Sequence, residues 1–60
     1  MHEYRVQTEG GQFLGFWALQ MQAVSGDVIE DGDGTLWRVL FKRMTAGSTL
    51  RPKLIVRKHY

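Results

Sequence analysis

Apolar and polar side chains alternate with a period of two along most of this 60-residue chain. β-Strands produce this spacing because successive side chains point to opposite faces of a sheet. In residues 2–8, for example, Tyr4 and Val6 fall on one side and charged or polar residues on the other. The pattern predicts strands at residues 2–8, 13–19, 35–43 and 50–58, and residues 25–30 are predicted to form a turn that leads into a fifth, short strand.

Glycine-rich turns separate these strands. Residues 9–12 contain a glycine pair and residues 31–34 contain two Asp-Gly pairs, and such residues reach the left-handed conformations of tight hairpin turns at little cost. A short turn at residues 45–48 predicts that the strands on either side of it form an antiparallel hairpin. Pro52 cannot donate a hydrogen bond to a sheet, so its end of the last strand is expected at a sheet edge or a bend.

The C-terminal hairpin is the clearest amphipathic element of the chain. Period-two counting predicts an inward row made of Trp37, Val39, Phe41, Leu54 and Val56. The opposite face is then expected to collect five basic residues, namely Arg38, Lys42, Arg51, Lys53 and Arg57. One element therefore carries both a large part of the core and a basic surface.

Residues 13–19 are apolar on both strand faces. Gly15 lies in the middle of this run and suggests a β-bulge, at which the strand changes the side chains that point inward. A second interpretation makes residues 16–24 a short helix, because they contain several good helix formers and the pair Ser25-Gly26 can end it. Such a short segment with no clear N-cap is a weak helix, so the strand is favoured.

These elements predict one all-β domain over residues 1–60, a small five-stranded, partly open barrel or strongly curved sheet built from antiparallel hairpins. The alternative is an α+β fold with the helix at residues 16–24. The chain has no cysteine, no signal-like apolar core and no apolar run long enough for a membrane span, which favours a cytoplasmic location and no membrane partner.

Charge is distributed unevenly along the chain. Residues 1–33 hold all six acidic residues and a single basic one, Arg5, whereas residues 34–60 hold seven basic residues and no acidic one. This asymmetry indicates either a basic surface with a binding role or two halves that attract each other in the fold.

Residues 25–44 contain a sequence pattern that is shared with known protein classes. It consists of Ser-Gly-Asp-Val-Ile, four further residues, and then Gly-Thr-Leu-Trp-Arg-Val. This pattern resembles that of SH3-like small β-barrels, including RNA-binding barrels of translation and transcription proteins. It is also similar to the second half of bacteriophage head-tail connector proteins. The first resemblance implies a barrel that binds RNA, and the second implies an assembly role.

Catalytic and metal-binding residues are not predicted. A serine nucleophile would have to recruit His2 or His59, which lie near the chain ends, where a general base is rarely held rigidly. A calcium loop that began at Asp31 would need a glutamate at its twelfth position, where Lys42 stands instead. We therefore expect no enzyme activity, no metal, no cofactor and no small-molecule substrate.

The basic hairpin face is the best candidate for function. It predicts a non-catalytic module that binds a polyanion such as RNA or DNA through backbone phosphates. Exposed aromatic side chains nearby would add stacking surfaces for unpaired bases, and the candidates are Phe13, Phe16 and Trp17. The alternative prediction is a protein-interaction or assembly subunit, including a homo-oligomer, because residues 13–19 offer more apolar surface than one thin sheet covers.

Overall fold

The computed structural model describes residues 1–44 and 51–59, so the predicted turn at residues 45–48 lies outside the described part. Five strands form the fold: β1 (His2–Thr8), β2 (Phe13–Leu19), β3 (Val28–Glu30), β4 (Leu36–Arg43) and β5 (Lys53–Lys58). The all-β prediction is confirmed. The alternative helix at residues 16–24 is wrong, because β2 continues to Leu19 and only turns and irregular backbone follow up to β3. The described residues include no helix that is long and apolar enough to cross a membrane.

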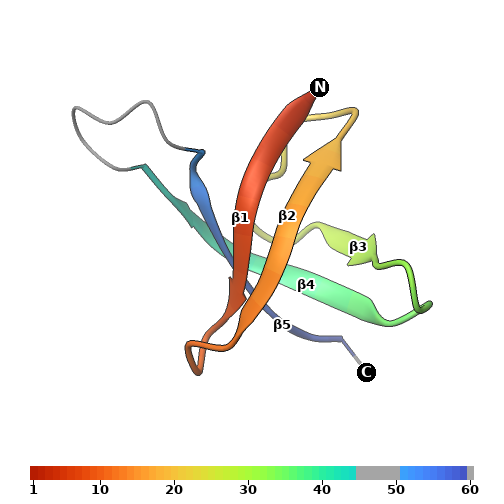
Figure 1. The fold of residues 1–60 in the computed structure, drawn as a ribbon. Helices are drawn as coiled ribbons and strands as arrows, with labels where there is room; N and C mark the ends of the chain where they lie inside the picture. The colour runs from red at the N-terminus through yellow and green to blue at the C-terminus, as the bar shows by residue number, and fades with distance from the viewer. Residues whose placement is uncertain (45–50, 60) are drawn as a thin grey trace.

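The strands form one sheet in the order β2-β1-β5-β4-β3. The hairpins β1–β2, β3–β4 and β4–β5 are antiparallel, as predicted, while β1 and β5 pair in parallel from Arg5 and Lys53 to Thr8 and Val56. This parallel junction joins the N-terminal and C-terminal parts of the chain at the centre of the sheet. The sheet curls into a half-barrel, in which β1 and β2 cross the direction of β4 (Figure 1).

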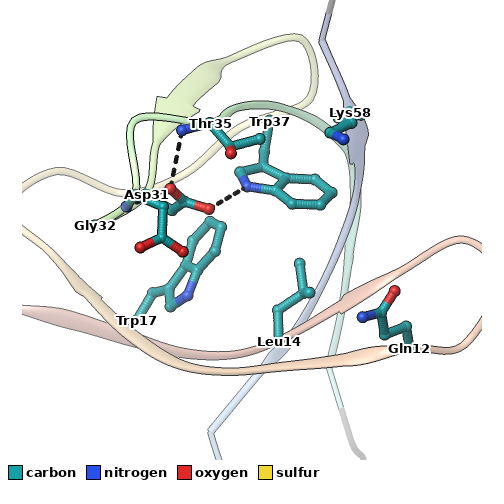
Figure 2. Close-up of a pocket in the computed structure, with 9 residues that line it drawn as sticks. Gln12, Leu14, Trp17, Asp31, Gly32, Thr35, Trp37 and Lys58 are labelled. Atoms are coloured by element: carbon teal, nitrogen blue, oxygen red, sulfur yellow. Dashed lines mark hydrogen bonds between the residues drawn. The ribbon is translucent and has the colours of Figure 1, made fainter.

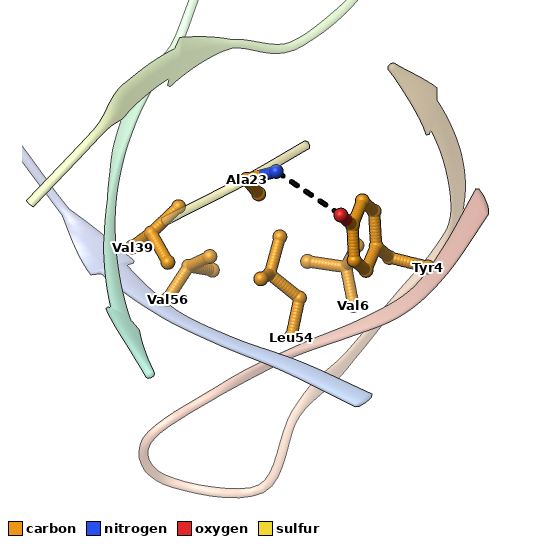
Figure 3. Packing of buried hydrophobic residues seen from close by; sticks show 6 residues of the cluster. All are labelled: Tyr4, Val6, Ala23, Val39, Leu54 and Val56. Atoms are coloured by element: carbon orange, nitrogen blue, oxygen red, sulfur yellow. Dashed lines mark hydrogen bonds between the residues drawn. The ribbon is translucent and has the colours of Figure 1, made fainter. Parts of the chain in front are cut away.

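The concave side of the half-barrel holds the hydrophobic core. Its buried members are Tyr4, Val6, Ala23, Val39, Leu54 and Val56 (Figure 3). Register pairs Val6 with Leu54 across the parallel junction and Val39 with Val56 across the β4–β5 hairpin. Four of the five predicted inward residues of the C-terminal hairpin therefore lie on this side, with Trp37 at the margin of the core.

The connection between β2 and β3 covers part of this core. Ala23, in the middle of the connection, is only 2% exposed, and its N–H donates a hydrogen bond of 3.0 Å to the Tyr4 hydroxyl oxygen (Figure 3). Gly26 N–H then donates to the Val39 carbonyl and Val39 N–H to the Asp27 carbonyl, each over 2.8 Å. The connection is thereby fixed to both β1 and β4.

A β-bulge in β2 explains why residues 13–19 are apolar on both faces. Val6 pairs with Gly15 but Gln7 pairs with Phe13, so Leu14 is an additional residue in the ladder. Gly15 has a φ of 117°, a left-handed conformation that favours glycine. The bulge predicted at Gly15 is confirmed, and it turns Leu14 toward the core while Phe13 remains outside.

A second bulge, in β4, was not predicted. Val39 pairs with Val56 but Phe41 pairs with Ile55, so Leu40 is the additional residue. Beyond a bulge, every side chain lies on the opposite face from the one that simple alternation assigns. The prediction that Phe41 points inward is therefore wrong, and its side chain is 42% exposed.

The parallel pairing also separates the two ends of the chain. Because Arg5 is opposite Lys53 and Thr8 is opposite Val56, His2 and His59 lie at opposite ends of the β1–β5 pair and do not form a common site. Pro52 lies directly before β5, and its carbonyl accepts a hydrogen bond of 2.9 Å from Arg5 N–H. β5 is thus a central strand whose ladder starts after the proline.

The Tyr4 hydroxyl is predicted to stabilise the fold through its bond to Ala23. Tyr4→Phe keeps the ring in the core but leaves the Ala23 N–H without its partner, which should lower the free energy of unfolding by about 1–3 kcal/mol. Urea denaturation followed by tryptophan fluorescence measures this change. Met21→Ala, at a side chain that is 80% exposed, is the control and should have little effect. An unchanged stability in Tyr4→Phe would contradict the prediction.

Candidate functional site

The convex side of the sheet, here called the outer face, carries its side chains in rows that run across the strands. The first, the basic row, contains Phe16 on β2, Arg5 on β1, Lys53 on β5 and Arg43 on β4, each directly opposite the next. Because neighbouring strands are ~4.8 Å apart, the three cations span ~10 Å. Such a row places several positive charges at regular intervals.

The next row on the outer face is apolar and is called the aromatic row. It contains Phe13, Gln7, Ile55 and Phe41, again opposite one another on β2, β1, β5 and β4. Phe13 is 49% exposed and Phe41 is 42% exposed, whereas Ile55 between them is only 6% exposed. A shallow hollow of about 290 Å³ lies at this row. Its lining includes the apolar side chains of Ile55 and Phe41, the cations Lys53 and Arg43, and the polar residues Gln7, Thr8 and Glu9.

A third row returns to positive charge. Arg38 on β4 is directly opposite Arg57 on β5, and the Arg38 guanidinium lies 3.4 Å from Nδ1 of His59. Positive charge therefore borders the aromatic row on both sides. This arrangement is suited to a ligand with negative charges and flat apolar groups.

Arginines of the outer face also contact its phenylalanines. The guanidinium carbons of Arg5 and Arg51 each lie 5.1 Å from a ring centroid, of Phe13 and Phe16 respectively. These two rings pack edge to face, with centroids 5.5 Å apart. Arg43 lies 5.7 Å from the ring centroid of Phe41. Cation–π contacts of this kind hold the guanidinium groups over the aromatic surface while leaving them accessible.

Acidic residues of the N-terminal part compensate some of this charge. Glu3 Oε1 accepts a hydrogen bond of 2.7 Å from Arg51 Nε, and Glu9 Oε1 lies 3.7 Å from Arg57 Nε. Among residues 1–44 and 51–59, these are the two ion pairs that form. The cations of the basic row and Arg38 have no ion pair within that range, so the outer face keeps a positive surplus.

The structure places the predicted site residues in two groups. Arg38, Arg51, Lys53 and Arg57 share the outer face with Phe13 and Phe16. Lys42 does not, because the bulge at Leu40 pairs it with core residue Leu54 and so turns it to the other face. Trp17 also faces the concave side, opposite Tyr4, and packs against the core.

Three residues of the outer face are not among the predicted site residues: Arg5, Arg43 and Phe41. Alternation in residues 2–8 already placed Arg5 on a polar face, but nothing in the sequence showed that β1 lies beside β5. Arg43 and Phe41 were missed because Leu40, unlike Gly15, gives no sign of a bulge.

A second polar feature lies on the concave side, in the loop between β3 and β4. Asp31 Oδ1 accepts hydrogen bonds from the N–H groups of Asp33 (2.8 Å) and Thr35 (3.0 Å). Its Oδ2 accepts a bond of 2.8 Å from the indole N–H of Trp37 (Figure 2). Hydrogen bonding from Trp37, together with the bonds from the loop backbone, lowers the pKa of Asp31, although partial desolvation acts in the opposite direction.

Two tryptophans border a pocket beside this loop. The pocket has a volume of about 500 Å³ and is lined by Gln12, Leu14, Trp17, Asp31, Asp33, Trp37 and Lys58, among others (Figure 2). It lies where β2, at one edge of the sheet, faces the β3–β4 loop at the other. The described residues contain no group of three or more histidine, cysteine, aspartate or glutamate side chains that is arranged to hold a metal ion.

Comparison of the chain with protein-family models, with curated proteins and with solved structures found no match. The outer face and the two-tryptophan pocket are therefore interpreted from their own chemistry.

The hydrogen bonds to Asp31 predict a pH dependence. A carboxyl group whose pKa is lower in the folded chain than its ordinary value of 3.8 stabilises the fold above that value, and this contribution is lost as the pH falls through the folded pKa. The NMR shift of the Trp37 indole proton should therefore titrate with a midpoint below 3.8. Asp31→Asn should abolish this titration and flatten the loss of stability in the same range. A midpoint at or above the ordinary value would contradict the prediction.

Proposed function

We propose that this protein is a non-catalytic binding module whose outer face holds single-stranded nucleic acid. The observation that carries the proposal is the order of the rows: the basic row, the aromatic row, and then the pair Arg38 and Arg57. A single strand has phosphates that need cations and unpaired bases that need flat apolar surfaces, and the outer face offers both in adjacent rows.

Phosphate binding in this proposal rests on arginine and lysine. Arg5, Arg38, Arg43 and Lys53 have no ion pair within residues 1–44 and 51–59, so their charge is not cancelled by a described carboxylate. Guanidinium groups bind phosphate through two parallel hydrogen bonds, and lysine contributes a compact charge. Neutralisation of backbone phosphates releases counterions, which makes such binding salt-dependent.

Base stacking rests on the half-exposed rings of Phe13 and Phe41, with Phe16 at the end of the basic row. These residues lie on paired strands, so their spacing is set by the sheet and not by loops. Stacking on aromatic side chains tolerates any base, and contacts to backbone phosphates carry no sequence information. The proposed binding is therefore largely independent of nucleotide sequence.

Self-association through the outer face is the less favoured alternative. A twofold dimer would pack the aromatic rows of two copies together, but it would also bring the two basic rows close to each other. Repulsion between the two basic rows would destabilise such a dimer, whereas a polyanion is attracted to the same charges. Acidic residues of the β3–β4 loop are the remaining candidates for a contact with a basic face of another copy.

The curled five-stranded sheet is compatible with an SH3-like barrel, in keeping with the resemblance of residues 25–44 to that class. We propose this assignment from the strand number, the hairpins and the curl of the sheet. The positions that would bind nucleic acid are argued from the outer face alone and do not depend on it.

The salt dependence of binding tests the proposal. Fluorescence anisotropy with a labelled oligothymidylate of about 12 nucleotides should show affinity that falls with salt, with a log–log slope of about −3 for four phosphate contacts. The double variant Arg38→Glu, Lys53→Glu should weaken binding by at least about tenfold and reduce the slope by about half. Affinity that stays constant between low and physiological salt would remove the proposal.

A matched variant separates position from net charge. Lys42 is opposite Leu54 and so lies on the concave side of the sheet, whereas Lys53 is opposite Arg5 and Arg43 on the outer face. Lys42→Glu changes the net charge by the same amount as Lys53→Glu, yet it should weaken oligothymidylate binding much less. Equal losses in these two single variants would show that binding follows net charge and not the outer face.

Stacking is tested separately at Phe13. Phe13→Leu keeps an apolar side chain but removes the ring, and it should cost about 1–3 kcal/mol of binding free energy, whereas Phe13→Tyr should bind nearly as well as the unaltered protein. The same anisotropy titration measures both, and circular dichroism checks the fold. If duplex DNA of the same length binds as tightly as the single strand, bases do not contribute and only the phosphate part of the proposal stands.

A further inference from the structure

The seam of the half-barrel, where the two edges of the sheet approach each other, has a chemistry opposite to that of the outer face. We use the name seam pocket for the 500 Å³ hollow lined by Trp17, Trp37, Leu14, Asp31, Asp33 and Lys58, with Gln12 at its margin. A second hollow of about 240 Å³ continues along the same seam, between Leu19 on β2 and Ile29 on β3. The two hollows also share Trp17 and Asp31.

Indole rings and carboxylates together favour an organic cation. The faces of tryptophan attract cations more strongly than those of the other aromatic residues. Asp31 and Asp33 add two negative charges. Figure 2 shows the Asp31 carboxylate close to the indole rings of both tryptophans, with a hydrogen bond from the Trp37 indole N–H. Because the Thr35 N–H, the Asp33 N–H and the Trp37 indole hold Asp31 in place, its charge is positioned before any ligand arrives.

Among the described residues that line the seam pocket, Lys58 is the one cation. It is opposite Trp37 in the β4–β5 ladder, and in Figure 2 it lies on the side of the Trp37 ring away from Asp31. Two carboxylates against one ammonium leave the pocket with a net negative charge. A phosphate group is therefore disfavoured here, which separates this pocket from the outer face.

The sheet edges favour an extended peptide as the carrier of the cation. β2 and β3 are the end strands in the described strand order, so alternate backbone N–H and C=O groups of each point away from the sheet. A peptide that adds a strand to such an edge gains backbone hydrogen bonds, and pockets for its side chains provide specificity. The hollow between Leu19 and Ile29, which Glu30 also lines, offers an aliphatic wall to a neighbouring side chain of the peptide.

We propose that the seam pocket binds an arginine side chain of an extended partner peptide, with the guanidinium group against Trp17 and Trp37 and hydrogen-bonded to the carboxylates of Asp31 and Asp33. Arginine fits better than lysine because its planar group stacks on indole and bonds carboxylates in two places. The proposal assigns a protein ligand to a second site and does not depend on nucleic-acid binding at the outer face.

Intrinsic fluorescence gives a direct test, because the chain has two tryptophans and both line the seam pocket. The probe is a blocked pentapeptide with a central arginine flanked by valine and threonine. Its matched control carries citrulline, a neutral side chain of the same shape, in place of arginine. The arginine peptide should change the emission saturably, and the citrulline peptide should bind at least about tenfold more weakly.

Variants then locate the site. Asp33→Asn should weaken the arginine peptide by about threefold to tenfold, and Lys58→Gln should strengthen it by about threefold, because each changes one charge beside the ligand. Glu9→Gln removes the same charge as Asp33→Asn but from the outer face, and it should have no effect. Circular dichroism confirms that each variant is folded, and Asp33 is suited to substitution because it is exposed.

Three results would overturn the proposal. They are the absence of a saturable change with the arginine peptide, equal binding of the citrulline peptide, and tighter binding of adenosine, which carries no phosphate, than of the arginine peptide. The last would assign the pocket to nucleobases. The outer-face variant Arg38→Glu, Lys53→Glu should bind the arginine peptide like the unaltered protein. Failure at the outer face and failure at the seam pocket are thus observed separately.

Discussion

The parallel pairing of β1 with β5 is the constraint on which the rest of the structure depends. It joins an N-terminal hairpin and a C-terminal hairpin, which form local contacts, into one sheet through contacts between residues nearly fifty positions apart. Val6 and Leu54 meet at this junction and are fully buried. The same pairing places Arg5 beside Lys53, and therefore completes the basic row, and it brings Glu3 to Arg51. Loss of this pairing would remove the core and the outer face together.

The strands and turns of this fold were predictable from the sequence, whereas the register between strands and the face on which each side chain lies were only partly predictable. Alternation and turn signals together predicted all five strands, although β5 begins at Lys53, after the proline that was placed inside it. The positive φ of Gly15 agrees with the bulge inferred at that residue. The bulge at Leu40 was not predictable, because leucine suits a regular strand and the extra residue is accommodated by the register with β5. One unrecognised residue was enough to misplace both Phe41 and Lys42, since the period of a strand is two.

The candidate site shows the same division. Arg38, Lys53 and Arg57 were correctly grouped on one face, because they lie on a hairpin whose strands are close in sequence. Arg5 belongs to the same surface, but its neighbours are set by the parallel pairing, which no local signal in residues 2–8 specifies. Trp17 was wrongly included among the exposed aromatic candidates. It lies in a strand that is apolar on both faces, and the bulge turns Leu14 inward and Phe13 outward. Trp17 then packs against the core while Phe16 is exposed.

The fold distributes the acidic residues between two surfaces, so the uneven charge of the sequence is only partly neutralised. Glu3 and Glu9 pair with arginines of the outer face, whereas Asp31 and Asp33 lie at the seam, beside two tryptophans. The outer face thereby stays positive and the seam stays negative, on opposite sides of a sheet that is a single layer thick. Each surface repels the ligand that we propose for the other through its own charge: phosphates are disfavoured at the seam, and cationic peptides are disfavoured at the outer face. Two sites of opposite preference can therefore coexist on a chain of this size.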